Sequence, residues 1–313
     1  MVRAVMPAET RTASPVPAAV TAWNRITPVR ASAIRGSLIA AGEKSTVVRI
    51  ESGLGAGRDV IAKRAKRSGV LREAYVYEHL LPASGSGLRF FGVGSDDDAS
   101  MAWLFVQDAA GVPFDASIHR HGRLVAEWLA ALHASMEEVD ANASSRLPRQ
   151  DATTYATRLR AAGVALRRRQ ALGDGADGTS IFEACLETCG RLEAGWGRVV
   201  ELSSLLPPTL VHGDISAENA RIVGDAVYLF DWEKVGWGTP SVDVARVDLD
   251  TYAARAHEMW GVSSAMVEAS AACGAIFRTL SHDWYAKSIR KLDLYRRRLA
   301  REMHAAGIAE ELR

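Results

Sequence analysis

Short apolar runs separated by turn residues fill the first third of the chain. The segments RGSLIAAGEKSTVVRIES (35–52), RDVIAKRA (58–65) and LRFFGVGSDDDASMAWLFVQ (88–107) predict strands, because their apolar runs are separated by glycine- and aspartate-containing turns. In GVLREAYVYEHLL (69–81) the apolar residues recur near every 3.6 positions, which predicts a helix. We therefore expect a small antiparallel β-rich lobe with one helix.

The remaining two thirds of the chain follow the helical period. Two short runs predict strands here, ARIV (220–223) and AVYLF (226–230), which flank a Gly-Asp turn. The segments that predict helices are 119–139, much of 152–171, 181–205 and most of 242–313. The sequence thus predicts a larger, mainly helical second lobe.

The two patterns meet near Gln107–Gly111 and predict an α+β fold of two lobes. We expect an N-terminal lobe over residues 26–110 and a C-terminal lobe over residues 111–313. Residues 1–25 have neither an apolar core nor a cleavable leader pattern, so they are predicted to form a disordered tail.

Composition excludes several classes of partner. The net charge of the 313 residues is +1, which provides no overall field for nucleic acid or an anionic membrane. Apolar runs stay well short of the ~20 residues that a membrane helix needs. The three cysteines have neither disulfide nor metal-site spacing and predict buried thiols. We expect a cytoplasmic protein that binds neither nucleic acid nor membrane.

The stretch LVHGDISAENARIVGDAVYLFDWE (210–233) carries the candidate chemistry. Asp214 and Asn219 lie on one predicted loop, and the short hairpin that follows returns Asp231 close to both. Carboxylate and amide oxygens are suitable ligands for magnesium, with water and phosphate completing its shell. Phosphoryl transfer needs such a metal and a positioned base, and it also needs a lysine for the phosphates. Lys63 on a predicted strand and Glu73 on the next predicted helix supply that lysine and its partner.

GLGAG (53–57) is the main competing pattern, since it suggests a dinucleotide-binding turn. That fingerprint requires a third glycine where Arg58 stands, and a helix where the strand RDVIAKRA follows. A hairpin loop is the better interpretation.

Three segments resemble one enzyme superfamily. HGDISAEN (212–219), FDWEKVGWGTPSVDVA (230–245) and EWLAALHAS (127–135) are similar to the signature blocks of the aminoglycoside phosphotransferase and choline kinase-like family, which is related to protein kinases. The resemblance extends with gaps from Ser37 to Asp250. It implies a protein-kinase-like fold and an ATP- or GTP-dependent, Mg²⁺-requiring phosphotransferase.

The resemblance also implies roles for individual residues. Asp214 would be the catalytic base, Asn219 and Asp231 the magnesium ligands. Lys63, steadied by Glu73, would bind the α- and β-phosphates of the nucleotide.

Further residues take supporting roles in the same comparison. The turn with Ser45 and Thr46 matches the loop over the phosphates, and Gln107 and Ala109 fall where hinge backbone groups meet adenine. His212 and Asp243 correspond to positions whose role in such folds is mainly structural.

The departures from protein kinases indicate a small-molecule acceptor. No arginine precedes Asp214, no lysine lies two positions after it, and no A-P-E segment follows. Segments 151–200 and 250–313, which are expected to build the acceptor site, have no surplus of acidic residues. We therefore expect a hydroxyl on an antibiotic or similar secondary metabolite as acceptor, in preference to a polycationic aminoglycoside. The alternatives are a metabolic kinase for a sugar, choline or an amino-alcohol, and a pseudokinase that regulates a partner.

Overall fold

The computed structural model describes residues 14–27, 35–42, 44–51, 59–81, 87–137, 139, 141–173 and 179–308. The chain divides into two compact units. Unit 1 contains the residues up to Tyr77 and Leu88–Ala110, and unit 2 contains Glu78–Gly87 and Gly111–Arg313. The glycine-rich stretch 53–57, predicted to be a hairpin loop, lies outside the described residues.

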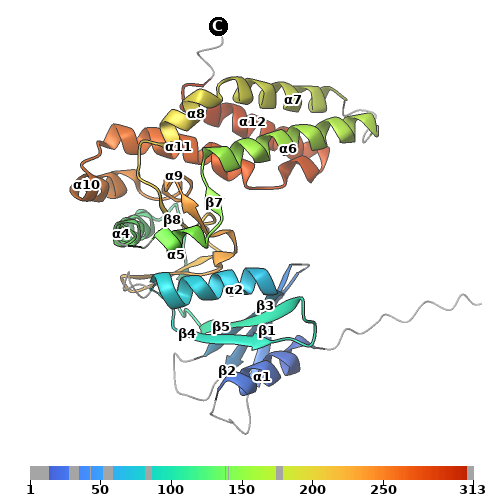
Figure 1. Ribbon diagram of the computed structural model, residues 1–313, viewed down its shortest axis with the longest axis vertical. Coiled ribbons are helices and arrows are strands. Elements are labelled where there is room, and N and C mark those ends of the chain that lie inside the picture. The colour runs from blue at the N-terminus through green and yellow to red at the C-terminus, as the bar shows by residue number, and fades with distance from the viewer. Residues whose placement is uncertain are drawn as a thin grey trace, which may run out of the picture. The chain divides into compact units, whose positions relative to one another are not determined.

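Unit 1 is built on one antiparallel sheet in the order β1-β2-β3-β5-β4 (Figure 1). The strands are β1 Arg35–Ala41, β2 Ser45–Glu51, β3 Val60–Lys66, β4 Phe90–Ser95 and β5 Met101–Gln107. Strand β3 lies in the centre, where its residues pair with β2 on one side and β5 on the other. The predicted strands and their antiparallel pairing are confirmed.

A helix that the sequence pattern did not predict packs on this sheet (Figure 1). Helix α1, Pro15–Ile26, begins after Ser14, whose side chain accepts a hydrogen bond from the backbone of Val16. Its Trp23 is buried, with ring centroids 5.3 Å from Phe105. The prediction of a disordered tail over residues 1–25 is therefore wrong for residues 15–25. Ala19, Ala22 and Trp23 are buried and Val16 and Ile26 pack beside them, but the prolines in the first turn of α1 favour a loop over a helix in the sequence.

The predicted helix of unit 1 is present in two forms. An α-helix, α2, spans Arg67–Tyr75 and continues as a π-helical turn, η1, over Val76–Leu80. The buried residues of α2 include Glu73, a charged side chain in an otherwise apolar interface.

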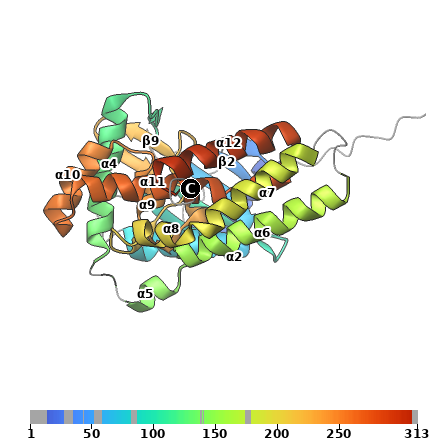
Figure 2. The same ribbon diagram turned by 90° about the horizontal axis from the view of Figure 1, so that it is seen from above.

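Helices dominate unit 2 and enclose its core. Figure 2 shows α6, α7 and α12 running side by side. Tyr155 on α6 stacks on Phe277 of α11 with ring centroids 4.1 Å apart. The three cysteines are buried free thiols, as predicted. The helices are α4 His119–Ser135, α5 Ala141–Ser145, α6 Ala152–Ala171, α7 Thr179–Ala194, α8 Trp196–Ser203, α9 Ser241–Val244, α10 Leu249–Trp260, α11 Ser264–Leu280 and α12 Ile289–Ala305, with 3-10 turns η2 Trp232–Lys234 and η3 Trp284–Ala286.

Two small sheets in unit 2 flank the loop 212–219. One has the order β10-β9-β6 and contains the predicted hairpin around Gly224, whose φ is 61°. The other has the order β7-β11-β8, and an added Cβ at Gly238 would lie 2.1 Å from the carbonyl oxygen of Gln150, so this strand pairing requires glycine. The strands are β6 Val112–Pro113, β7 Arg149–Gln150, β8 Thr209–Val211, β9 Ala220–Val223, β10 Ala226–Leu229 and β11 Gly236–Gly238.

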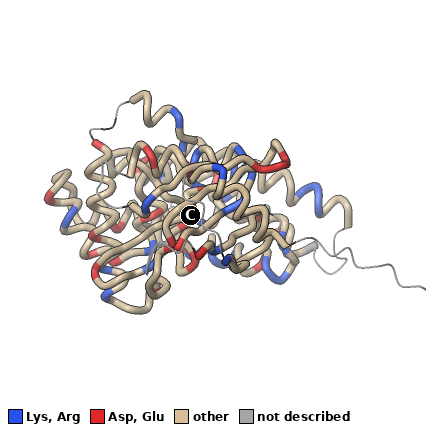
Figure 3. Tube along the Cα trace, turned by 90° about the horizontal axis from the view of Figure 1, so that it is seen from below, with Lys and Arg blue, Asp and Glu red and all other residues tan. Residues whose placement is uncertain are grey.

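Charge is interspersed along the chain. Figure 3 shows basic and acidic positions alternating over the described trace, in keeping with the net charge of +1. Among the described residues, no helix combines the length and the apolar character that crossing a bilayer requires.

Candidate active site

A buried ion pair occupies the centre of unit 1. Lys63 on β3 lies between Val47 of β2 and Leu104 of β5, and its Nζ is 2.5 Å from Oε1 of Glu73 on α2. The side chains of Lys63 and Glu73 are only 10% and 1% exposed. Burying either charge without the other is costly, so each holds its partner in place. The structure thus brings together the two residues that the sequence paired.

Four further candidate residues lie at strand ends of the same sheet. Ser45 and Thr46 begin β2. Gln107 ends β5, where its backbone N–H donates to the carbonyl of Arg89, and Ala109 follows two residues later. Their roles in nucleotide binding stay predictions.

In unit 2, Asp243 fixes the backbone of the loop that carries Asp214. The carboxylate of Asp243, on α9, accepts hydrogen bonds from the backbone N–H groups of His212 at 2.7 Å and Gly213 at 2.9 Å. Burial raises the pKa of Asp243, and the two backbone donors offset part of that effect. Gly213 has a φ of 80°, and a Cβ there would lie 2.8 Å from the carbonyl oxygen of Lys234. Glycine is therefore required next to Asp214.

His212 is a structural residue in this loop. Its Nδ1 accepts a hydrogen bond from the backbone of Asp214 at 3.2 Å, so its Nε2 carries the proton and donates to the carbonyl of Phe230 at 3.0 Å. Burial lowers the pKa of His212, which keeps the ring neutral. Both nitrogens are thereby occupied, and neither is available to move a proton.

Asp214 forms an ion pair that the sequence did not predict. Lys234, twenty positions later, places its Nζ 2.9 Å from Oδ2 of Asp214. Both side chains are partly exposed, at 37% for Lys234 and 29% for Asp214. Burial raises the pKa of Asp214, but the hydrogen bond and charge of Lys234, with the charge of Arg278, lower it further than burial raises it. The carboxylate is therefore charged at neutral pH, which is the form a general base needs.

The sequence contained one signal for Lys234. Lysine accounts for only six of the 38 basic residues, so a lysine inside a catalytic block is notable. No lysine lies two positions after Asp214, and Lys234 reaches it instead from the η2 turn. The side-chain amide of Gln150 donates to the carbonyl of Lys234 at 3.0 Å and holds that turn.

Asn219 and Asp231 lie beside this pair. The side-chain Nδ2 of Asn219 donates to the carbonyl of Asp214 at 3.0 Å, and the backbone of Phe230, next to Asp231, donates to the carbonyl of Asn219 at 3.0 Å. Asp231 has φ 64° and ψ 62°, the one positive φ outside glycine among the described residues. A left-handed backbone at a residue with a side chain is strained and is typical of functional sites.

The donor set of Asn219 and Asp231 fits magnesium. The bond from Nδ2 of Asn219 leaves its Oδ1 as an acceptor, and Asp231 adds a carboxylate. Magnesium is commonly held by one or two protein oxygens together with waters and substrate phosphates. In the described part of the chain, no three His, Cys, Asp or Glu side chains cluster as a metal site. Water and the oxygens of the nucleotide would complete the shell of a metal at this site.

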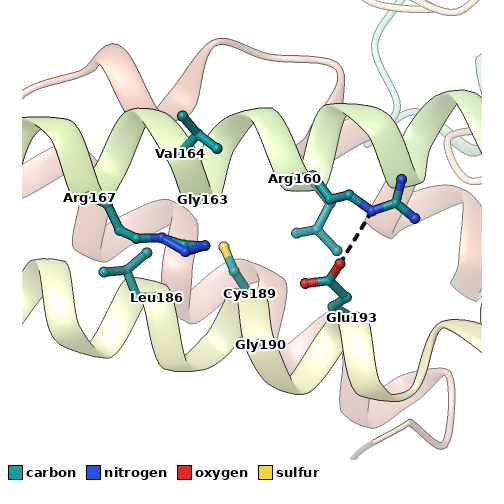
Figure 4. Close-up of a pocket in the computed structure, with 9 residues that line it drawn as sticks. Arg160, Gly163, Val164, Arg167, Leu186, Cys189, Gly190 and Glu193 are labelled. Atoms are coloured by element: carbon teal, nitrogen blue, oxygen red, sulfur yellow. Dashed lines mark hydrogen bonds and ion pairs between the residues drawn. The ribbon is translucent and has the colours of Figure 1, made fainter.

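A cavity of about 530 Å³ lies elsewhere in unit 2, between α6 and α7 (Figure 4). Gly163 and Gly190 leave space between the two helices, and Arg160 pairs with Glu193 across it. None of the predicted site residues lines this cavity. It is not part of the candidate active site.

Comparison with known proteins identifies the family. The model of the phosphotransferase enzyme family matches residues 35–260, and the chain belongs to this family. This confirms the predicted family and the predicted enzyme class, a phosphotransferase. No curated protein matches the sequence significantly.

Solved structures with the same fold include small-molecule kinases. The choline kinase of Cryptosporidium parvum Iowa II is 13% identical with a TM-score of 0.60, and the match covers 91% of each chain. The aminoglycoside phosphotransferase of Alicyclobacillus acidocaldarius is 13% identical with a TM-score of 0.57, over 96% of this chain and 97% of that one. A thermostable mutant aminoglycoside phosphotransferase in a ternary complex with ADP and hygromycin B is 13% identical with a TM-score of 0.55, over 88% and 94%. These similarities confirm the predicted two-lobed kinase-like fold.

Proposed function

We propose that this member of the phosphotransferase enzyme family transfers the γ-phosphoryl group of ATP or GTP to a hydroxyl group of a small molecule. The observation that carries the proposal is that the Asp214 carboxylate is charged and partly exposed. Lys234 keeps its carboxylate charged, and Asn219 is bonded to its backbone. A partly exposed charged carboxylate next to a magnesium-type donor set is what a hydroxyl acceptor requires.

In the proposed reaction, Asp214 accepts the proton of the acceptor hydroxyl. The hydroxyl oxygen forms a bond with the γ-phosphorus, and the bond from that phosphorus to the β–γ bridging oxygen breaks. The nucleoside diphosphate leaves with the electron pair of the broken bond. The protein contributes mainly position and charge, because the transition state of phosphoryl transfer needs little covalent assistance.

The remaining site residues bind the nucleotide in this proposal. Lys63 binds the α- and β-phosphates and depends on Glu73 for its position. Ser45 and Thr46 lie over the phosphates, while the backbone near Gln107 and Ala109 meets adenine.

Asn219 and Asp231 would hold Mg²⁺ through oxygen atoms. When bound, the ion neutralises charge on the phosphate oxygens. The strained backbone of Asp231 supports this role, because such strain persists where a fixed side-chain direction matters.

The proposed acceptor is a hydroxyl on an antibiotic or similar secondary metabolite. The likeness to an aminoglycoside phosphotransferase with bound ADP and hygromycin B supports an antibiotic. The absence of an acidic surplus in segments 151–200 and 250–313 argues against a polycationic aminoglycoside. A metabolic kinase is the second candidate, favoured by the likeness to choline kinase. A pseudokinase is disfavoured because Lys63, Asp214, Asn219 and Asp231 are all present.

A coupled assay of nucleoside diphosphate release tests the proposal. The purified chain is given ATP or GTP with Mg²⁺ and a panel of antibiotics, sugars and amino-alcohols. Acceptor-dependent release that Asp214→Asn abolishes is the expected result. Nucleotide binding without turnover of any acceptor would favour the pseudokinase instead.

A further inference from the structure

A buried arginine near Asp214 has no partner. Arg278 on α11 is 5% exposed, and its Nε and Nη1 atoms are enclosed without a hydrogen-bond partner. Among the described residues, no carboxylate oxygen lies within 4 Å of its guanidinium. An unpaired buried charge is expensive and rare in natural proteins. We therefore expect a ligand that supplies acceptor atoms for these donors.

Close packing of two helices places Arg278 near the base. Helix α11 crosses α9 at Gly274, where an added Cβ would lie 1.8 Å from the carbonyl oxygen of Ser241. Arg278 follows one turn later. Burial lowers the pKa of Arg278 to about 10 and Arg246 adds repulsion, whereas the charges of Asp243 and Asp214 act in the opposite direction. The guanidinium is thus protonated at neutral pH. Hydrogen bonds from Ser281 through Tyr155 and Gln150 to the carbonyl of Lys234 connect this end of α11 to the partner of Asp214.

A second arginine lies near the same end of α11. Ser281, the C-cap residue of this helix, lies three positions after Arg278. Arg158 of α6 donates to Oγ of Ser281 at 3.1 Å, and no carboxylate of the described chain lies within 4 Å of it. Arg278 and Arg158 therefore both lie near this end of α11 without a carboxylate oxygen of a described residue within 4 Å.

We infer that the acceptor carries an anionic group, a carboxylate or a phosphate, which binds the guanidinium of Arg278 while the acceptor hydroxyl lies at Asp214. The inference rests on the proposed function. A guanidinium offers a planar fork of N–H donors that matches either anion. A quaternary ammonium or polyamine acceptor would offer no acceptor atom to Arg278 and would be repelled by its charge and by that of Arg158.

A purely structural role for Arg278 makes a different prediction. The C-terminal end of α11 favours a cation through the helix dipole, but it supplies no acceptor for Nε or Nη1. If Arg278 only stabilises the helix end, replacing it lowers the stability of the protein and lowers kcat/KM equally for all acceptors. If it binds the acceptor, its loss affects the KM of anionic acceptors and leaves kcat nearly unchanged.

The first experiment uses the unmodified protein. Steady-state kinetics compare matched hydroxyl acceptors: hydroxy acids with their neutral amides, sugar acids with sugars, and sugar phosphates with sugars. We expect kcat/KM at least tenfold higher for the anionic member of a pair, and the three sets distinguish carboxylate from phosphate. Equal or better use of the neutral or cationic acceptors would overturn the inference while leaving the proposed function intact. Failure to phosphorylate any acceptor would instead overturn the proposed function.

The second experiment uses two variants and a control. Arg278→Gln should raise KM for the anionic acceptors at least tenfold with little change for the neutral ones. Arg278→Lys, which keeps the charge, should recover part of that loss. Arg255→Gln, an exposed arginine on α10 paired with Glu258, should change neither. Thermal unfolding of each variant is measured first, and an equal loss for anionic and neutral acceptors in a folded Arg278→Gln would contradict the inference.

Discussion

Two lysine–carboxylate pairs, one in each unit, differ in exposure and therefore in what they do. Lys63 and Glu73 are enclosed between a sheet and a helix, with side chains 10% and 1% exposed. Lys234 and Asp214 are 37% and 29% exposed and lie on adjoining loops. A closed pair fixes a position and is costly to break, whereas an open pair sets the charge of a group that must meet a substrate. In the proposed reaction, the same two functional groups would therefore serve positioning in unit 1 and chemistry in unit 2.

Removing one member of the closed pair should have the largest effect. Lys63→Ala removes the lysine that is bonded to the buried Glu73, and breaking a typical buried pair in this way costs roughly 3–5 kcal/mol. We expect a large loss of stability in unit 1 together with severely weakened nucleotide use. Urea unfolding and nucleotide titration measure the two effects.

Lys66→Ala is the matched control, because Lys66 is the exposed last residue of the same strand. An exposed substitution of this kind changes stability by about 0.5 kcal/mol or less. Equal losses from Lys63→Ala and Lys66→Ala would show that the buried pair has no special role.

Neutralising the carboxylate of the open pair should affect chemistry instead. Asp214→Asn retains the shape of the side chain but removes the proton acceptor, so turnover should fall by ~10² or more. Nucleotide affinity should change little, since the proposed nucleotide contacts lie on other residues. Single-turnover kinetics and calorimetric titration separate the two quantities, and near-native turnover would exclude Asp214 as the base.

The closed pair could be predicted from the sequence, and the open pair could not. Lys63 and Glu73 lie on elements with clear strand and helix patterns, and the family resemblance aligns both. Lys234 contacts Asp214 only because the β9–β10 hairpin and the η2 turn bring back a segment twenty residues away, and no local pattern encodes that contact.

Other parts of the fold were missed for similar physical reasons. Helix α1 packs Ala19, Ala22 and Trp23 on the sheet with Val16 and Ile26 beside them, but the prolines of its first turn are typical of a loop in the sequence. Strands β7 and β11 have two and three residues, too few for alternation to show, and they depend on tertiary packing around Gly238. Arg278 was passed over because its significance is its missing partner, which only the packing of α11 on α9 reveals.

The pH dependence of turnover should show whether Lys234 controls the charge of Asp214. The pKa of Asp214 is lowered below its ordinary 3.8, although burial raises it, because the hydrogen bond and charge of Lys234 outweigh burial. The charged base therefore persists as pH falls to below 3.8, and the stabilisation from the pair is lost only as pH falls through that lowered value. Lys234→Gln removes both effects of the lysine and leaves burial, so the acid limb of the kcat/KM profile should move to higher pH.

A variant at a surface lysine of the same unit provides the control for that shift. Lys291→Gln lies on the exposed side of α12 and should leave the acid limb where it is. An unchanged profile in Lys234→Gln would mean that the lysine does not control the base.

The smallest expected effect is the contribution of the open pair to stability. Exposed ion pairs contribute about 0.2–1 kcal/mol, because water screens the charges and two long side chains lose freedom. Lys234→Gln should therefore lower the free energy of unfolding of unit 2 by an amount in that range, well below the loss from Lys63→Ala in unit 1. Urea unfolding at low and at high salt measures it, and salt should reduce the difference further because the pair is exposed. A loss from Lys234→Gln as large as that from Lys63→Ala would mean that the Asp214–Lys234 pair is part of the packing of its unit, and the division between a positioning pair and a chemical pair would no longer hold.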